Sequence, residues 1–265
     1  TETSIRELFA AGFIPGILGI FLYLGAVKWV LWRDPEAGPA AQKVPWPERI
    51  AALKSVGSTL ALFVLVIGGI YLGIFTPTEA AGIGAMGAFL IALMRRSLSP
   101  RVLMNVLMDT VRTTAMLFAV VLTALIFANF INRAGLPNDL LALVSGMNVA
   151  PFVVILTIIA IYVVLGCVFE SMSMLLLTVP VFFPVVAGLG YDLVWFGILV
   201  VIVIEISLIT PPVGMNVFVL RAVLPDVATG TIFRGVTPFW VAGTLRALLV
   251  LLLPGIVLFL PDLLY

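Results

Sequence analysis

Apolar residues follow one another in long blocks along most of this chain, and polar residues are confined to a few short segments. A membrane helix needs about 20 apolar residues, at about 1.5 Å each, to cross a hydrocarbon core of about 30 Å. Residues 9–32 fit one span, whereas residues 56–94 exceed one span and are broken near residue 76. The pattern therefore predicts several membrane-spanning helices.

The polar segments between the blocks predict how the chain is oriented. The most polar stretch, 33–54, is predicted to be a solvent-exposed loop. Basic residues flank the 56–94 block on both sides, at Arg33, Lys43, Arg49, Lys54, Arg95, Arg96 and Arg101. Because cytoplasmic loops carry an excess of Lys and Arg, both flanks are predicted to lie in the cytoplasm.

The second half of the chain has a less regular pattern. Residues 101–133 begin amphipathically and become apolar, which predicts an interfacial helix that turns into a span. Two long apolar blocks, 151–190 and 193–220, are each interrupted by polar residues, prolines or glycines. A last block, 235–260, also contains prolines and an arginine.

Composition excludes several function classes. Hydrophobic residues make up 63% of the 265 residues, charged residues make up 10%, and the mean hydropathy is +1.27. A soluble domain has about 45–50% apolar and about 25% charged residues, so a soluble enzyme is excluded. The net charge of +1 argues against nucleic-acid binding, and the single cysteine excludes an intrachain disulfide. The sequence has no histidine and no G-x-x-x-x-G-K-[ST] motif, which argues against histidine-based catalysis and ATP hydrolysis.

The interruption at 166–173 lies midway along its apolar block. Non-helical backbone survives in hydrocarbon only where it is buried in protein or lines a cavity. One interpretation is the tip of a re-entrant hairpin, with the Ser171 and Ser173 hydroxyls facing a cation, and the other is an ordinary loop with Glu170 in water. Apolar arms of about 15 residues are short for full spans, which favours the hairpin. Cys167 is expected to be a small buried hydrophobe.

The interruption at 210–214 contains two adjacent prolines. Pro211 and Pro212 have no N–H, so the carbonyls one turn earlier, from about 207 to 210, lose their helical partners and suit a hard cation. We expect Thr210 to cap a helix that restarts at Pro211. Gly214 permits close backbone approach and Asn216 offers a donor and an acceptor. The alternative is a simple proline kink in a packing helix.

The interruption at 76–79 fits a capping box. Thr76 is the expected N-cap, Pro77 occupies the first helical position, and the Glu79 side chain reaches back to the backbone of the cap. This arrangement accounts for every polar residue in the segment, so we assign it to structure.

Charged residues inside the apolar blocks are functional candidates by default. Glu205 lies about one turn before the Pro-Pro break, and it fits a functional carboxylate and a structural partner of a buried donor equally well. Four arginines fit an anionic substrate or an anchor at the membrane interface, namely Arg112, Arg133, Arg221 and Arg246.

Three long motifs carry a resemblance to a known family. They are GGIYLGIFTPTEAAGIGA (68–85), GCVFESMSMLLLTVPVFFPVV (166–186) and WFGILVVIVIEISLITPPVGMNVFV (195–219), followed by PDVATGTIFRGVTPFWVA (225–242). Together they resemble the large membrane subunit of tripartite ATP-independent periplasmic (TRAP) transporters. That subunit consists of two inverted repeats, and this chain is similar to the second repeat with the connecting helix before it. The resemblance therefore implies a fragment, or one of two pieces of a split subunit, that lacks the first repeat.

The resemblance implies an all-α polytopic membrane protein, the second inverted repeat of an elevator-type secondary transporter with a re-entrant hairpin and a discontinuous helix. It implies Na⁺ as the coupling ion, no cofactor, no enzymatic activity, and organic acid substrates of the C4-dicarboxylate or sialic-acid type. The implied partners are a periplasmic substrate-binding protein, a small four-helix membrane subunit, the missing N-terminal repeat and the lipid bilayer of the bacterial inner membrane. A non-transporting scaffold or assembly piece remains the alternative. An intramembrane hydrolase at Ser171 or Ser173 lacks a histidine or an obvious lysine base.

Motif matching also implies the site residues and the organisation of the chain. The sodium ligands are expected among Gly166, Glu170, Ser171, Ser173, Ser207, Thr210, Pro211 and Gly214. The substrate ligands are expected among Ser171, Thr178, Pro212 and Asn216. Two positions depart from the family, because Glu170 stands where aspartate is frequent and Ser207 where glycine is frequent. The expected division is a connecting helix (1–32), a cytoplasmic loop (33–55), scaffold and arm helices (56–134), a transport domain with the hairpin and broken helix (135–225) and a C-terminal scaffold helix (226–265).

Overall fold

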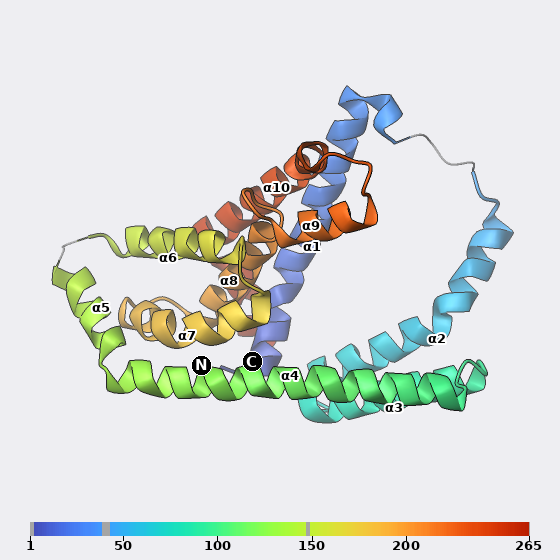
Figure 1. The fold of residues 1–265 in the computed structure, drawn as a ribbon, viewed down its shortest axis with the longest axis horizontal. Helices are drawn as coiled ribbons and strands as arrows, with labels where there is room; N and C mark the ends of the chain where they lie inside the picture. The colour runs from blue at the N-terminus through green and yellow to red at the C-terminus, as the bar shows by residue number, and fades with distance from the viewer. Residues whose placement is uncertain (1–2, 39–42, 147–148, 265) are drawn as a thin grey trace. The chain divides into compact units, whose positions relative to one another are not determined.

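The structure is a computed structural model that describes residues 3–38, 43–146 and 149–264, and every regular element in these ranges is a helix (Figure 1). The elements in chain order are α1 (Ile5–Arg33), the short 3₁₀ helix η1 (Pro35–Ala37), α2 (Trp46–Tyr71), α3 (Pro77–Met94), α4 (Pro100–Arg133), α5 (Leu136–Gly146), α6 (Pro151–Gly166), α7 (Ser171–Gly188), α8 (Leu193–Ser207), α9 (Met215–Val223), α10 (Thr229–Leu252) and α11 (Gly255–Leu264). The predicted all-α class is confirmed.

Five helices of the described ranges, α1, α3, α4, α7 and α10, are long and apolar enough to cross a bilayer. They confirm a multi-pass membrane protein. Helices α6 and α8 are equally apolar but have only 16 and 15 residues. At about 1.5 Å per residue, each is shorter than a hydrocarbon core of about 30 Å.

The chain forms two compact units, one of Gly38–Phe118 and one of Thr1–Ala37 together with Ala119–Tyr265. In the first unit α2 packs against α3. The capping box at the start of α3 is confirmed, because the Thr76 hydroxyl accepts from the Glu79 N–H and the Glu79 carboxylate accepts from the Thr76 N–H.

The prediction of a loop over residues 33–55 is partly wrong. Residues from Trp46 onward belong to α2, and Pro47 lies in the first turn of that helix. A proline is tolerated there, since the first N–H groups of a helix have no intrahelical partner. The cytoplasmic location of this segment stays a prediction.

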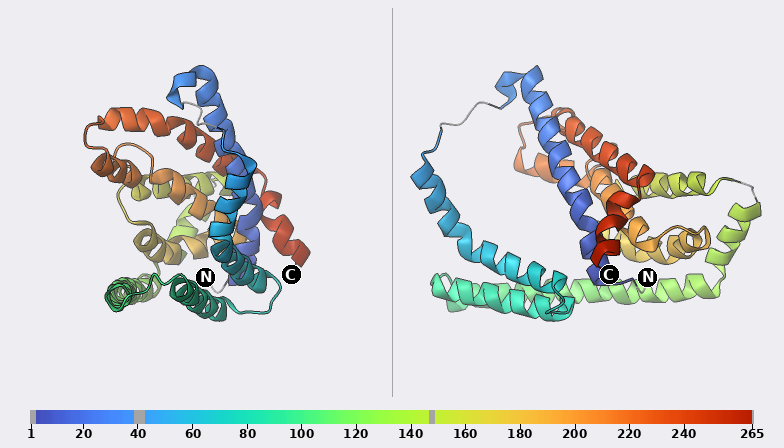
Figure 2. Two further views of the ribbon diagram at one scale, coloured as in Figure 1. Left: turned by 90° about the vertical axis from the view of Figure 1, so that its right-hand side faces the viewer. Right: turned by 180° about the vertical axis from the view of Figure 1, so that it is seen from behind.

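The core of the second unit surrounds α8. The buried side chains of Trp195, Leu199 and Val203 lie on this helix, which packs against α1, α6, α7, α10 and α11 (Figure 2). The Trp195 indole N–H donates to the carbonyl oxygen of Val250 in α10 at 2.9 Å. The apolar residues that fill α8 therefore make it the central helix of this unit.

The sequence-based division into scaffold and transport domains stays a prediction. In the structure, helices assigned to both domains pack against one another. The segments expected to be the connecting helix (1–32) and the C-terminal scaffold helix (226–265) supply α1, α10 and α11, and all three contact α8. They belong to the same compact unit as the hairpin and the broken helix.

Candidate functional site

The first part of the candidate site is a helical hairpin. The Thr178 hydroxyl in α7 lies 2.8 Å from the Tyr162 hydroxyl in α6. The two residues flank the turn on opposite sides, so this contact shows that α6 and α7 run antiparallel. The Tyr162 ring also lies 5.7 Å from the Phe182 ring. These contacts hold the two arms together and place the turn at residues 167–170.

The turn ends on a carboxylate that caps α7. Glu170 is the N-cap residue, and its side chain accepts from the Met172 N–H at 3.0 Å and from the Ser173 N–H at 2.9 Å. The Ser173 hydroxyl donates to the same carboxylate at 3.2 Å. Two orphan N–H groups at the start of α7 are thus satisfied, and negative charge at a helix N-terminus is favourable.

The second part of the site is the break between α8 and α9. Helix α8 ends at Ser207, and the chain becomes helical again at Met215. The prediction that Thr210 caps a helix beginning at Pro211 is wrong, since the N-cap of α9 is Gly214 with φ of 60°. The Thr210 hydroxyl instead donates to the Ile206 carbonyl at 2.7 Å. A residue before proline is disfavoured in helical conformation, which is why the helix does not restart at once.

The break folds back on itself. The Asn216 N–H donates to the Leu208 carbonyl at 3.0 Å, and the Thr210 N–H donates to the Ser207 carbonyl at 3.1 Å. Two of the carbonyls expected to be free, those of Ser207 and Leu208, therefore have backbone partners, and the expectation is wrong for both. The left-handed conformation at Gly214 is open to glycine at little cost. A Cβ there would also lie 3.2 Å from the Thr210 carbonyl oxygen, so this position favours glycine for two reasons.

The hairpin tip lies against the break in α8. A Cβ added to Gly166 would lie 2.6 Å from the Cβ of Ser207, so the backbones meet at this point only because residue 166 has no side chain. The Cys167 thiol lies 3.6 Å from the Thr210 carbonyl oxygen and 3.7 Å from that of Pro211. We call this contact of residues 166–167 with residues 207–211 the junction.

The structure brings some of the predicted ligands together and keeps others apart. Gly166, Ser207, Thr210 and Pro211 meet at the junction, where Ser207 and Thr210 are buried. Glu170, Ser171 and Ser173 lie at the start of α7, just beyond the turn. The Thr178 hydroxyl is bonded to Tyr162 inside the hairpin. Pro212, Gly214 and Asn216 lie on the α9 side of the break. Ligand roles for all of these residues stay predictions.

The oxygen atoms at the junction are those that a hard cation prefers. The Ser207 hydroxyl donates to the Ile204 carbonyl at 2.6 Å and the Thr210 hydroxyl donates to the Ile206 carbonyl at 2.7 Å. The Thr210 oxygen also accepts one hydrogen bond, from Trp240, so it retains one acceptor site. Within the described ranges no group of three His, Cys, Asp or Glu side chains is placed to hold a metal ion. The groups that meet at the junction are hydroxyl and carbonyl oxygens, and oxygen ligands of this kind suit hard cations.

Sequence reasoning missed the role of α10. The Trp240 indole N–H donates to the Thr210 hydroxyl at 2.9 Å. A Cβ at Gly243 would lie 3.0 Å from the Ile206 side chain. The spacing of Trp240, Gly243 and Arg246 places these three residues on one face of a helix, but the sequence does not indicate which helix that face contacts.

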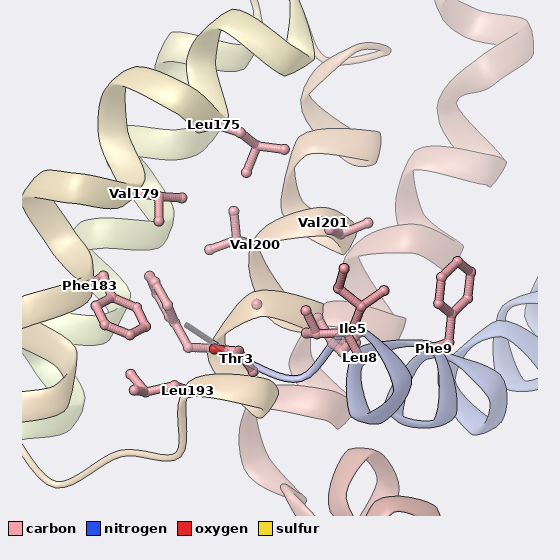
Figure 3. A pocket seen from close by; sticks show the side chains of 13 residues that line it. Thr3, Ile5, Leu8, Phe9, Leu175, Val179, Phe183, Leu193, Val200 and Val201 are labelled. Carbon is pink, nitrogen blue, oxygen red and sulfur yellow. The ribbon is translucent and has the colours of Figure 1, made fainter. Parts of the chain in front are cut away.

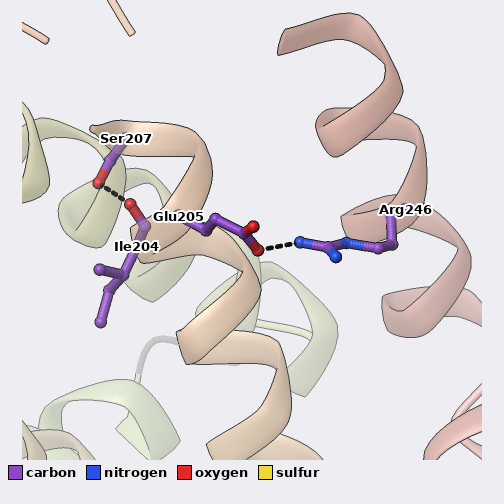
Figure 4. A network of polar contacts seen from close by, with 4 residues as sticks. All are labelled: Ile204, Glu205, Ser207 and Arg246. Atoms are coloured by element: carbon purple, nitrogen blue, oxygen red, sulfur yellow. Dashed lines mark hydrogen bonds and ion pairs between the residues drawn. The ribbon is translucent and has the colours of Figure 1, made fainter. Parts of the chain in front are cut away.

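Glu205 is paired with Arg246, the structural alternative of the two considered for it (Figure 4). Arg246 is buried and its guanidinium lies over the Tyr23 ring at 5.7 Å, whereas the Glu205 side chain is 52% exposed. A lone carboxylate at the centre of a membrane helix costs about 2.5–3.5 kcal/mol on insertion scales. Ionisable groups within membrane-spanning segments usually pair with one another, and Arg246 pairs with a carboxylate of this chain.

An apolar cavity of about 430 Å³ lies elsewhere in the unit (Figure 3). Side chains of α1, α7 and α8 line it, among them Leu8, Phe9, Val179 and Phe183. Among the described residues that line the cavity, Thr3 supplies the one polar side chain and none is charged.

Comparisons with known proteins identify relatives along the full chain. The model of the family described as "Tripartite ATP-independent periplasmic transporter, DctM component" matches residues 1–256. The chain is 34% identical to the C4-dicarboxylate TRAP transporter large permease protein DctM of Pseudomonas aeruginosa, over 99% of this chain and 61% of that protein. It is 33% identical to the sialic acid permease protein SiaM of Vibrio cholerae, over 99% of this chain and 61% of that protein. It is 34% identical to the ectoine permease protein TeaC of Halomonas elongata, over 98% and 61%. The chain thus spans about 61% of the length of these relatives.

Proposed function

The chain belongs to the DctM component family of tripartite ATP-independent periplasmic transporters, and on that premise we propose that it forms part of a Na⁺-coupled permease for organic acid anions. In this proposal residues 166–178 form a re-entrant hairpin, and residues 207–216 form the broken helix that faces it. Na⁺ binds where the two breaks meet, and the substrate binds beside it.

The observation that carries the proposal is the junction. Two interruptions more than 30 residues apart in an apolar sequence lie in contact, with Gly166 against Ser207 and Cys167 against the Thr210 and Pro211 carbonyls. Irregular backbone at membrane depth is tolerated where it is buried or lines an ion path. Secondary transporters place coupling ions at unwound carbonyls of discontinuous helices. The short helices α6 and α8 support the same interpretation, since neither is long enough to span a bilayer.

The substrate class is an organic acid of the C4-dicarboxylate or sialic-acid type. The named relatives transport C4-dicarboxylates, sialic acid or ectoine, so their names favour a small organic molecule and select no single one. We propose that selection depends chiefly on a periplasmic substrate-binding protein, which delivers the substrate to the permease.

The proposed assembly extends beyond this chain. The relatives are longer, and we propose that the first inverted repeat supplies the other half of the binding region. A small four-helix membrane subunit completes the scaffold in the bacterial inner membrane, and the transport domain moves as an elevator against it. Each Na⁺ that enters down a potential of 100 mV contributes about 2.3 kcal/mol before any concentration term.

The proposal is tested with the complete permease, reconstituted with its small subunit in proteoliposomes and supplied with loaded binding protein. We expect uptake to require an inward Na⁺ gradient. Ser171→Ala and Thr210→Ala should each raise the Na⁺ concentration that gives half-maximal uptake. Thr123→Ala is a matched control, because its hydroxyl donates within α4 to the Ala119 carbonyl and lies outside the junction.

The two parts of the proposal fail in different ways. Uptake that proceeds equally well without Na⁺ would contradict the coupling ion. Na⁺-dependent uptake that neither Ser171→Ala nor Thr210→Ala changes would contradict the site while leaving the coupling intact.

A further inference from the structure

Helix α10 contacts the end of α8 at three successive points along one face. The Trp240 indole N–H bonds the Thr210 hydroxyl, Gly243 lies against Ile206, and the Arg246 guanidinium pairs with the Glu205 carboxylate. The three α10 positions are spaced by three residues, and their partners are the last turn of α8 and the first residues of the break. A helix turn held at three points can neither rotate nor slide without losing one of them.

Arg246 is itself fixed from its other side by α1. A Cβ at Gly19 would lie 2.5 Å from Nη1 of Arg246, so the guanidinium rests on a helix surface that has no side chain at that point. The Tyr23 ring lies under the guanidinium and 6.0 Å from the Phe239 ring, which ties it to α10. The Arg246 Nε has no hydrogen-bond partner among the described residues, so the ion pair with Glu205 is the main polar contact of the guanidinium.

We propose that Arg246 and Glu205 act as a positioning pair for the cation site at the junction, an inference that rests on the proposed function. Arg246 holds the Glu205 carboxylate, and Glu205 lies two residues before the end of α8. The pair therefore sets the rotation of the turn that carries the Ile204 and Ile206 carbonyls, which accept from Ser207 and Thr210. Neither charged group contacts the ion in this scheme.

The test is a double-mutant cycle in the complete reconstituted permease, with Glu205→Gln, Arg246→Gln and both together. We expect each single variant to raise the Na⁺ concentration for half-maximal uptake about tenfold, which corresponds to about 1.4 kcal/mol. Because the two groups act as one unit, the double variant should be shifted no further than the single ones. Arg246→Lys, which keeps the charge but loses the planar fork of the guanidinium, should give an intermediate value.

Arg234→Gln is the matched control. Arg234 lies on α10 like Arg246, but its side chain is exposed, and the substitution removes one positive charge as Arg246→Gln does. It should leave the Na⁺ dependence unchanged. Shifts in the single variants that multiply in the double variant would overturn the pairing. Variants that only lower the thermal midpoint, or a control that shifts as much as Arg246→Gln, would overturn the positioning role.

A second measurement covers variants that lose uptake and separates this inference from the proposed function. Cys167 is the one cysteine of the chain, and it is buried at the junction. Its alkylation by N-ethylmaleimide, followed by mass spectrometry of the labelled peptide, reports how tightly the junction is closed. Glu205→Gln should accelerate alkylation and Arg234→Gln should not. If wild-type uptake proves independent of Na⁺, the proposed function fails, and the alkylation rates alone decide whether the pair positions the junction.

Discussion

Two turns of this molecule have the same local design. Each follows a glycine whose missing Cβ leaves room for a neighbouring side chain, and in each a glutamate side chain accepts from backbone N–H groups at the start of the next helix. In the turn between α2 and α3, Phe75 presses on Gly69, and Glu79 completes a capping box with Thr76. In the turn between α6 and α7, Ser207 presses on Gly166, and Glu170 caps the next helix. The first contact joins residues of one turn, whereas the second joins two breaks that lie far apart in the chain.

The comparison teaches that helix capping by itself does not distinguish a structural turn from a functional one. In both turns the side chain of the cap residue accepts from N–H groups at the start of the helix that follows. They differ in the neighbour of the glycine. The turn after α2 packs only on a residue of the same turn, Phe75. The turn after α6 packs on the break after α8, so it lies beside the backbone carbonyl oxygens of another segment.

The largest difference is expected from alanine at the two glycines. Overpacking a filled site costs about 1–3 kcal/mol, so Gly166→Ala and Gly69→Ala should destabilise the protein to a similar degree. Only Gly166→Ala displaces the tip from Ser207, and it should raise the Na⁺ concentration for half-maximal uptake by about ten- to 100-fold. Uptake in proteoliposomes and the thermal midpoint measure the two effects.

Gly16→Ala is the control for this pair, because a Cβ at that helical position has no neighbour within 4 Å. It should change neither quantity. An equal shift of Na⁺ dependence in Gly69→Ala and Gly166→Ala would remove the distinction between the two turns.

A smaller effect is expected from removing the caps. Thr76→Ala and Glu170→Ala each delete a side chain that accepts from backbone N–H groups, and the loss of an N-cap costs about 0.5–2 kcal/mol. Amide hydrogen exchange should accelerate at Glu79 in the first variant and at Met172 and Ser173 in the second. If Thr76→Ala alters Na⁺-dependent uptake as much as Glu170→Ala does, the turn after α2 is not merely structural.

The smallest effect is expected from Trp240→Phe. The substitution keeps an aromatic ring but removes the N–H that bonds the Thr210 hydroxyl, and a hydrogen bond of this kind contributes about 0.5–1.5 kcal/mol. The Na⁺ concentration for half-maximal uptake should rise by no more than about tenfold. Trp29→Phe is the control, because the Trp29 ring is exposed beside Arg33 and contacts no part of the junction. A Trp29 variant that shifts uptake equally would count against the contact with Thr210.

Local features could be predicted from the sequence. The capping box at Thr76 and Glu79 involves residues three apart, so its geometry follows from the order of the residues alone. The interruption predicted over 166–173 contains the observed break in helix at 167–170, and the predicted burial of Cys167 is confirmed. Both follow from composition within a few residues.

Features that depend on register between helices could not be predicted. The pairing of Glu205 with Arg246 joins residues 41 positions apart and depends on how α10 is rotated against α8. The restart of helix after the two prolines was placed too early, at Pro211 rather than Met215, because the bond from Asn216 to the Leu208 carbonyl forms only once the chain has folded back. The contact of Trp240 with Thr210 arises in the same way.

The contact between Arg246 and Gly19 also constrains how this sequence drifts over generations. A Cβ at position 19 would lie 2.5 Å from Nη1 of Arg246, so a side chain there requires the guanidinium to move. A lineage that replaces the glycine therefore has to shift or shorten the side chain at 246, which disturbs its ion pair with Glu205. Positions 19, 205 and 246 are expected to be inherited as a set, and their substitutions should covary in an alignment although no two of them are neighbours in the chain.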